Sequence, residues 1–134
     1  MIPFHPVLVV CEEQETRDQI ARAIVKRNLR PVCCFSLRDA RSLLARENFS
    51  VVFCSDLLPD GNFRDVTRVA SRIGRSAPLV LLSRRADWDA YLGALRAGAF
   101  DSIACPPDSA ETERVLQSAL LEASRKKHGL EAVL

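Results

Sequence analysis

Reactive and polar side chains follow directly after four apolar runs of the sequence. Two of these places carry carboxylates, Glu12 and Asp56, and carboxylate oxygens are common protein ligands of Mg²⁺. Hydroxyl and thiol groups stand beside them, and a neighbouring base or charge can activate both as nucleophiles. Any chemistry of this chain is expected at these places, which are Cys11-Glu12-Glu13, Cys54-Ser55-Asp56, Ser83 and Cys105-Pro106.

Short apolar strands would position these clusters. The run 51–54 is apolar throughout and rich in β-branched and aromatic side chains, as in a parallel strand buried on both faces. It stops at Ser-Asp, and Pro59-Asp60-Gly61 predicts a turn. Open α/β sheets place their ligand sites at the carboxyl ends of such strands. The expected strands are 6–11, 31–35, 51–54, 77–82 and 100–105.

Apolar residues at helical spacing separate these strands and predict five helices. Ser36 is expected to cap the second helix, and Gly129 to end the last one. Strands that alternate with helices over short connections predict an α/β fold. The expected architecture is a five-stranded parallel sheet of order 2-1-3-4-5 with helices on both faces, which is the flavodoxin-like arrangement.

The composition is that of a single globular domain. A chain of 134 residues predicts one domain, 1–134, with a core over about 6–125 and a short tail, 129–134. With 19 basic and 17 acidic residues the net charge is +2, too balanced to indicate nucleic acid or a membrane surface as the partner. No apolar run is long enough to span a bilayer, and residues 1–6 do not resemble a signal peptide, so a cytoplasmic protein is expected.

The cysteines do not form a recognisable framework. There are five, an odd number, and no two have the Cys-x-x-Cys spacing of structural zinc sites. Cys11 and Cys105 belong to strands that two others separate, which predicts a distance beyond the reach of a disulfide. The sequence therefore favours reduced cysteines and argues against a redox role.

These features together resemble the receiver domain of two-component response regulators over about residues 6–125. The resemblance rests on the apolar run 7–10 before an acidic turn, on Leu58-Pro59-Asp60-Gly61, on Ser83, on Ala97-Gly98-Ala99-Phe100-Asp101 and on the Pro106 turn. It implies self-catalysed phosphorylation of an aspartate with the help of Mg²⁺. It also implies an acidic pair, an acceptor, a hydroxyl, a lysine and a switch aromatic, at positions that are here Cys11 and Glu12, Ser55, Ser83, Cys105 and Ser102.

Most of this machinery is therefore absent from the sequence. Of the acidic pair only Glu12 carries a carboxylate, and a single carboxylate is a weak ligand set for Mg²⁺. A cysteine at position 105 lacks the positive charge that phosphoryl transfer requires. The leading interpretation is a degenerate receiver that is no enzyme, is not phosphorylated and needs no cofactor. One alternative is an active acceptor at Asp56 with Glu12 and Mg²⁺. Another is a crevice that binds a small anion near Arg84-Arg85 without turnover.

In the receiver family, the face formed by the fourth helix, the fifth strand and the fifth helix commonly contacts partners. The corresponding residues here are Trp88, Tyr91, Leu92, Ser102 and Ala104. Trp88 and Tyr91 suit either the core or an exposed anchor, and the pattern slightly favours the core. The expected partner is a signalling protein, either a kinase or a regulator, or a second copy of the chain.

Overall fold

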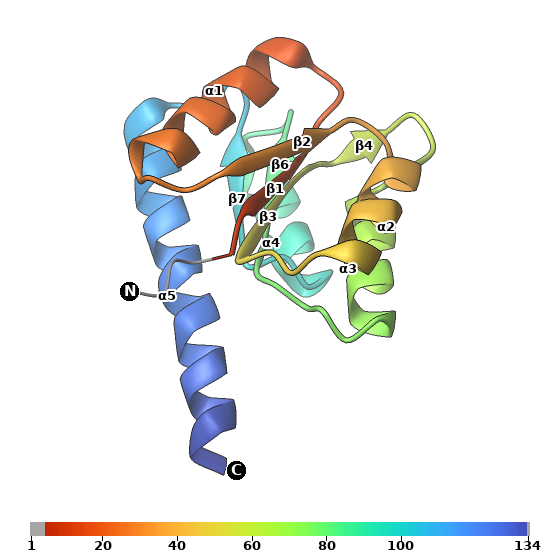
Figure 1. Cartoon of the computed structure of the whole chain (residues 1–134). Coiled ribbons are helices and arrows are strands. Elements are labelled where there is room, and N and C mark those ends of the chain that lie inside the picture. The colour runs from red at the N-terminus through yellow and green to blue at the C-terminus, as the bar shows by residue number, and fades with distance from the viewer. Residues whose placement is uncertain (1–4, 134) are drawn as a thin grey trace.

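The computed structural model describes residues 5–133, with side chains over residues 5–125. Its centre is a parallel sheet of five strands in the order β2-β1-β3-β6-β7 (Figure 1). Because β6 and β7 are the fourth and fifth strands of this sheet, the predicted order is confirmed. The strands are β1 (Val7–Val10), β2 (Pro31–Cys34), β3 (Val51–Ser55), β6 (Leu79–Ser83) and β7 (Asp101–Ala104).

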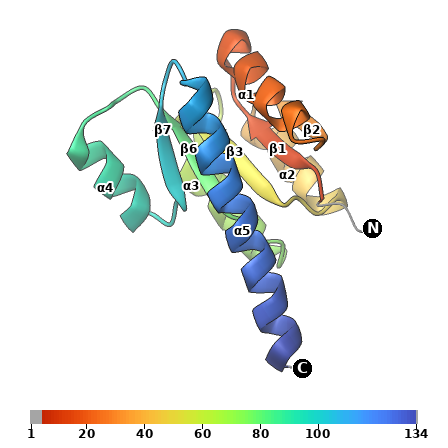
Figure 2. The same cartoon turned by 90° about the vertical axis from the view of Figure 1, so that its left-hand side faces the viewer.

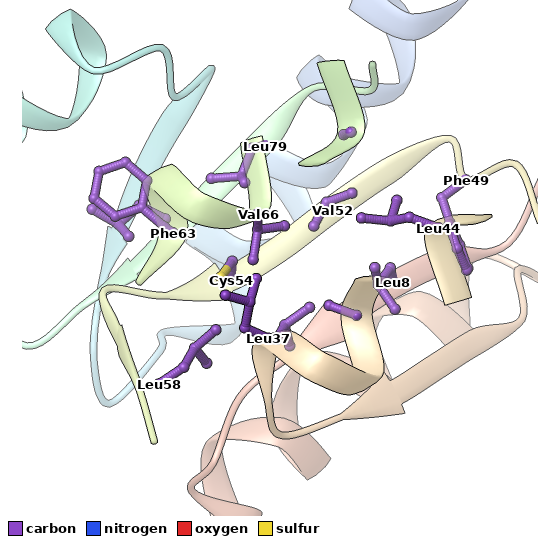
Figure 3. Close-up of a cluster of buried hydrophobic side chains, with 14 of the residues drawn as sticks. Leu8, Leu37, Leu44, Phe49, Val52, Cys54, Leu58, Phe63, Val66 and Leu79 are labelled. Atoms are coloured by element: carbon purple, nitrogen blue, oxygen red, sulfur yellow. The ribbon is translucent and has the colours of Figure 1, made fainter. Parts of the chain in front are cut away.

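Helices cover both faces of the sheet, as the continuous apolar strands predict. One buried cluster joins the sheet to α1 and α5, and it includes Ile24 and Leu116. A second cluster joins the opposite face to α2, α3 and α4 through Leu44 and Val66, among others (Figure 3). The helices are α1 (Gln14–Lys26), α2 (Leu37–Arg46), α3 (Phe63–Arg72), α4 (Trp88–Arg96) and α5 (Ser109–Val133).

Short polar contacts define the start of α2. The hydroxyl of Ser36 accepts a hydrogen bond from Asp39 N at 3.1 Å, which confirms the predicted cap. The carboxylate of Asp60 accepts two more, from Leu37 N at 2.7 Å and Arg38 N at 3.0 Å. These backbone donors lower the pKa of Asp60, since they stabilise its charged form. The loop after β3 is therefore fastened to the amino end of α2.

A small hairpin that the sequence did not predict follows β3. Strand β4 (Leu57–Leu58) pairs with β5 (Gly61–Asn62), antiparallel, around the predicted turn at Pro59 and Asp60. Strands of two residues are too short to show a hydrophobic period, which is why the pattern could not reveal them. The hairpin leads directly into α3, whose first turn Asn62 and Asp65 close with reciprocal hydrogen bonds.

Helix α5 is longer than the sequence predicted. Gly129 was expected to end it, but the helix continues to Val133 and includes most of the predicted tail, 129–134; Leu134 lies outside the described residues. One glycine inside a helix costs only about 1 kcal/mol relative to alanine, too little to stop a helix by itself. The carboxyl-terminal part of α5 extends past the sheet (Figures 1 and 2).

Within the described residues, no helix has both the length and the apolar character needed to cross a bilayer.

Candidate functional site

A cleft of about 420 Å³ opens at the carboxyl ends of β1, β3 and β6. It lies where the strand order changes direction, between β1 and β3, as open parallel sheets predict. It brings together side chains from the first, second and fourth predicted clusters. The lining residues are Cys11, Glu12, Glu13, Thr16, Ser55, Asp56, Leu57, Leu58, Leu82, Arg84 and Cys105.

Ser55 and Asp56 lie side by side at the end of β3, and both are half-buried. Asp56 Oδ1 accepts a hydrogen bond from Leu57 N at 2.9 Å. The nearest cation is the guanidinium of Arg84, whose Nε is 3.8 Å from the same oxygen. Asp56 therefore lies in the cleft, as the alternative hypothesis requires, but with an arginine beside it.

The acidic turn after β1 lines the cleft with both of its glutamates, as predicted, and both are exposed to solvent. Glu12 is exposed, and the carboxylate of Glu13 accepts a hydrogen bond from the Thr16 hydroxyl. Arg17 Nη1 donates to two carbonyl oxygens of this turn, those of Cys11 at 2.9 Å and Glu12 at 3.3 Å. The guanidinium of Arg17 is thus bound to the backbone of this turn, although Arg17 itself does not line the cleft.

Ser83, the one retained hydroxyl of the family pattern, does not line the cleft. Only 5% of Ser83 is exposed, and its hydroxyl is occupied in its own loop. It donates to the carbonyl of Arg85 at 3.0 Å and accepts from Arg85 N at 3.1 Å. Ser83 thus lies between Leu82 and Arg84, which do line the cleft, while its own hydroxyl bonds to the backbone of the loop after β6.

The thiol of Cys105 carries no charge that could replace the lysine of the family pattern. Burial, with smaller contributions from Cys11, Glu13 and Asp56, raises the pKa of Cys105 to about 11. The thiol is therefore neutral near pH 7. Cys11 and Cys105 line the same cleft although two strands lie between theirs in the sheet, and both are free thiols.

Carboxylates are the possible magnesium ligands of this cleft. Mg²⁺ requires near-octahedral oxygen ligands, of which a protein usually supplies one or two carboxylates besides phosphates and water. Among the described residues, no three histidine, cysteine, aspartate or glutamate side chains come close enough together to hold a metal. Glu12 and Asp56 remain as the two carboxylates predicted for it, and Arg84 lies beside one of them.

A second hollow, of about 460 Å³, lies between α4, β7 and α5. The ring of Trp88 is stacked on that of Tyr91 with centroids 5.6 Å apart, and 70% of Trp88 is exposed. The slight preference for Trp88 as a core residue is therefore wrong, because α4 buries only Ala94 completely. The lining includes four of the five predicted face residues, Trp88, Tyr91, Ser102 and Ala104, but not Leu92, which is half-buried.

The charged groups around this hollow are largely paired with one another. Arg85 Nη2 is 2.8 Å from Asp87 Oδ2, and Arg114 is 3.8 Å from Glu111. The carboxylate of Asp87 also caps α4 by accepting from Ala90 N at 2.7 Å, and this bond lowers the pKa of Asp87. Paired charges around an exposed indole leave the aromatic surface as the main feature that a partner could recognise.

The chain is similar to known regulators in sequence and in fold. No protein-family model matches it. It is 27% identical to the response regulator protein PilR of Pseudomonas aeruginosa over 113 residues, covering 84% of this chain and 25% of that protein. It is also 27% identical to the regulatory protein AtoC of Escherichia coli over 128 residues, covering 95% of this chain and 28% of that protein. The chain thus spans about a quarter of the length of the curated relatives it matches.

Solved structures give the same assignment of the fold. The chain superposes with a TM-score of 0.83 on NtrX from Brucella abortus, at 21% identity, covering 98% of this chain and 30% of that one. A CheY-like receiver domain protein from Methanospirillum hungatei gives 0.80 at 14% identity, covering 92% of this chain and 99% of that one. The receiver domain of a LuxO repressor protein from Vibrio parahaemolyticus gives 0.81 at 15%, covering 93% and 96%. The chain therefore has the fold of a response-regulator receiver domain and is similar in sequence to response regulators.

Proposed function

We propose that this receiver domain signals by protein contact and without being phosphorylated. The observation that carries the proposal is the cleft itself. The acceptor position holds Ser55, the lysine position holds a neutral thiol at Cys105, and the retained Ser83 hydroxyl is bonded within its own loop. Phosphoryl transfer relies on positioned charge, and the cleft provides few of the groups that would supply it.

The other candidate is phosphorylation of Asp56. In its favour, Asp56 is half-buried in the cleft with Glu12 nearby on the lining. Against it, the nearest cation to the Asp56 carboxylate is Arg84, and no cluster of metal ligands forms among the described residues. A small anion is less well supported as a ligand, because Arg84 and Arg85 each lie beside a carboxylate, Asp56 and Asp87.

Incubation with acetyl phosphate and Mg²⁺ should leave the intact mass of the protein unchanged. The expected result follows from the missing charge and the missing acceptor carboxylate at Ser55. Asp56→Asn and Ser55→Ala serve as matched variants. A phosphoryl adduct that Asp56→Asn abolishes would establish the alternative acceptor, and one that Ser55→Ala abolishes would place the group on the serine. Either adduct would refute the proposal.

We assign the contact surface to the hollow between α4, β7 and α5, where Trp88 is exposed. Aromatic residues that become buried on binding often dominate the affinity of an interface. One partner that this face can meet is a second copy of the chain. Self-association measured by sedimentation equilibrium should weaken about tenfold or more in Trp88→Ala, which corresponds to about 1.4 kcal/mol.

Val25→Ala is the matched control for this experiment. Val25 is 57% exposed on α1, which packs on the opposite face of the sheet from α4, so its loss should not change the association. An equal effect of both variants would contradict the assigned surface. A protein that stays monomeric at every concentration would exclude the second copy and leave another signalling protein as the partner.

A further inference from the structure

We propose that Arg84 supplies, within this chain, the positive charge that a divalent ion supplies beside the acceptor in metal-dependent receivers, and that it thereby excludes such ions from the cleft. This goes beyond the proposed function, because it concerns how the cleft is neutralised rather than whether the domain is phosphorylated. The two proposals are also tested by different measurements: metal affinity tests the role of Arg84, and intact mass tests whether the domain is phosphorylated.

Arg84 lies close enough to the Asp56 carboxylate to compete with a cation for it. It follows β6 directly, lines the cleft, and places Nε 3.8 Å from Asp56 Oδ1. An ion bound to the Asp56 carboxylate would lie at a similar short distance from the guanidinium. Like charges at such a distance repel each other, so a dication and Arg84 compete for the same carboxylate.

The loop after β6 fixes the backbone position of Arg84. Its two neighbours are held by short contacts: the Ser83 hydroxyl bonds to the backbone of Arg85, and the Arg85 side chain pairs with Asp87 at 2.8 Å. Asp87 in turn caps α4. Arg84 therefore lies in a short loop tied at the serine and at the helix, and its side chain is the one that reaches toward Asp56.

Groups in and beside the cleft agree with a site neutralised by arginine rather than by metal. Arg17 Nη1 bonds to the carbonyl oxygens of Cys11 and Glu12, which places a second guanidinium on the acidic turn. Cys105 adds no charge at neutral pH, because its pKa is raised to about 11. Within the part of the chain that the structure describes, no three potential metal ligands lie close enough together to hold an ion.

The ion pair between Arg84 and Asp56 is weak because its side chains are exposed to solvent. The side chain of Arg84 is 70% exposed and that of Asp56 is 27% exposed, and ion pairs of this kind contribute little to folding. The effect to expect is therefore on the affinity of the cleft for a cation, with the fold unchanged. Arg84 can therefore be substituted without unfolding the domain.

The test is a titration of the whole chain with Mn²⁺, which replaces Mg²⁺ at oxygen sites and is read by electron paramagnetic resonance. Four proteins are compared at constant ionic strength: the wild type, Arg84→Gln, Arg84→Gln with Asp56→Asn, and Arg85→Gln. Arg85 is the matched control, since it has similar exposure, 68% against 70%, but pairs with Asp87 outside the cleft.

We expect Arg84→Gln to bind Mn²⁺ about tenfold more tightly than the wild type, as removal of one nearby positive charge predicts. The double variant should return to the wild-type value, because the gained site uses Asp56, and Arg85→Gln should not differ from the wild type. The inference is overturned if Arg84→Gln gains no affinity, if the gain survives in the double variant, or if Arg85→Gln gains as much. Circular dichroism of each variant verifies that the fold is retained.

Discussion

Replacing Phe53 by alanine should lower the free energy of unfolding by about 3–5 kcal/mol, the usual cost of removing a buried phenyl ring. Phe53 lies in β3, which pairs with β1 on one side and β6 on the other, and its exposed fraction is 0%. Its side chain belongs to the buried cluster that α1 and α5 cover. A domain of this size has a total stability of about 5–15 kcal/mol, so the variant should lose a large fraction of it. Urea denaturation followed by circular dichroism measures the loss.

Phe35→Ala is the matched control, since it removes the same side chain one residue beyond β2. Phe35 is 54% exposed, and its ring contacts the Arg17 guanidinium at 5.3 Å. The loss of this exposed contact should cost no more than about 0.5–1 kcal/mol. Equal losses in the two variants would mean that the sheet centre is not packed as described.

A rise in pH above 9 should destabilise the folded protein steeply because of its buried thiols. Burial raises the pKa of Cys34 from its ordinary value of 9.0 to about 12, and it raises the pKa of Cys54 as well. Between these values the unfolded chain loses a proton from Cys34 and the folded one keeps it. Deprotonation therefore favours the unfolded state, by about 1.4 kcal/mol for each pH unit from this one thiol. The protonated Cys34 thiol contributes its full stabilisation below pH 9, and this contribution is lost as the pH rises toward 12.

Urea unfolding at a series of pH values on either side of 9 tests this effect with Cys34→Ala and Cys33→Ala. The Cys34 variant should lose stability less steeply than the wild type in the alkaline range. Cys33 is exposed on the same strand, so its thiol changes its surroundings less on unfolding and its variant should change the slope less. Identical slopes for all three proteins would show that the thiols do not control the alkaline transition.

The sheet could be predicted from the sequence because its strands are buried on both faces. The residues of β1 are 0% exposed, and a strand in that environment must be apolar at every position. The end of α5 could not be predicted, because a glycine at 129 is compatible with either a stop or a continued helix. The β4–β5 hairpin was missed because its register rests on backbone pairing between residues such as Leu58 and Gly61.

The position of the cleft could be predicted from the sequence, but the contacts between the side chains around it could not. The carboxyl ends of β1 and β3 meet because parallel neighbours end at the same edge, which places Glu12 near Asp56 from topology alone. Arg84 was visible in the sequence, yet its pairing with Asp56 depends on how the loop after β6 turns. The same turn brings the Ser83 hydroxyl into hydrogen bonds with the backbone of Arg85, and no periodic pattern encodes a loop of this kind.

Trp88 is the only tryptophan in the chain, and it stands on α4 with most of its ring in contact with water. The intrinsic fluorescence of the protein, excited selectively at the indole, therefore comes from one known site. A docking event on this helix would shift that emission toward the blue and shield it from a dissolved quencher such as acrylamide. The native polypeptide thus contains its own optical reporter, and titrations can be followed without attaching a dye.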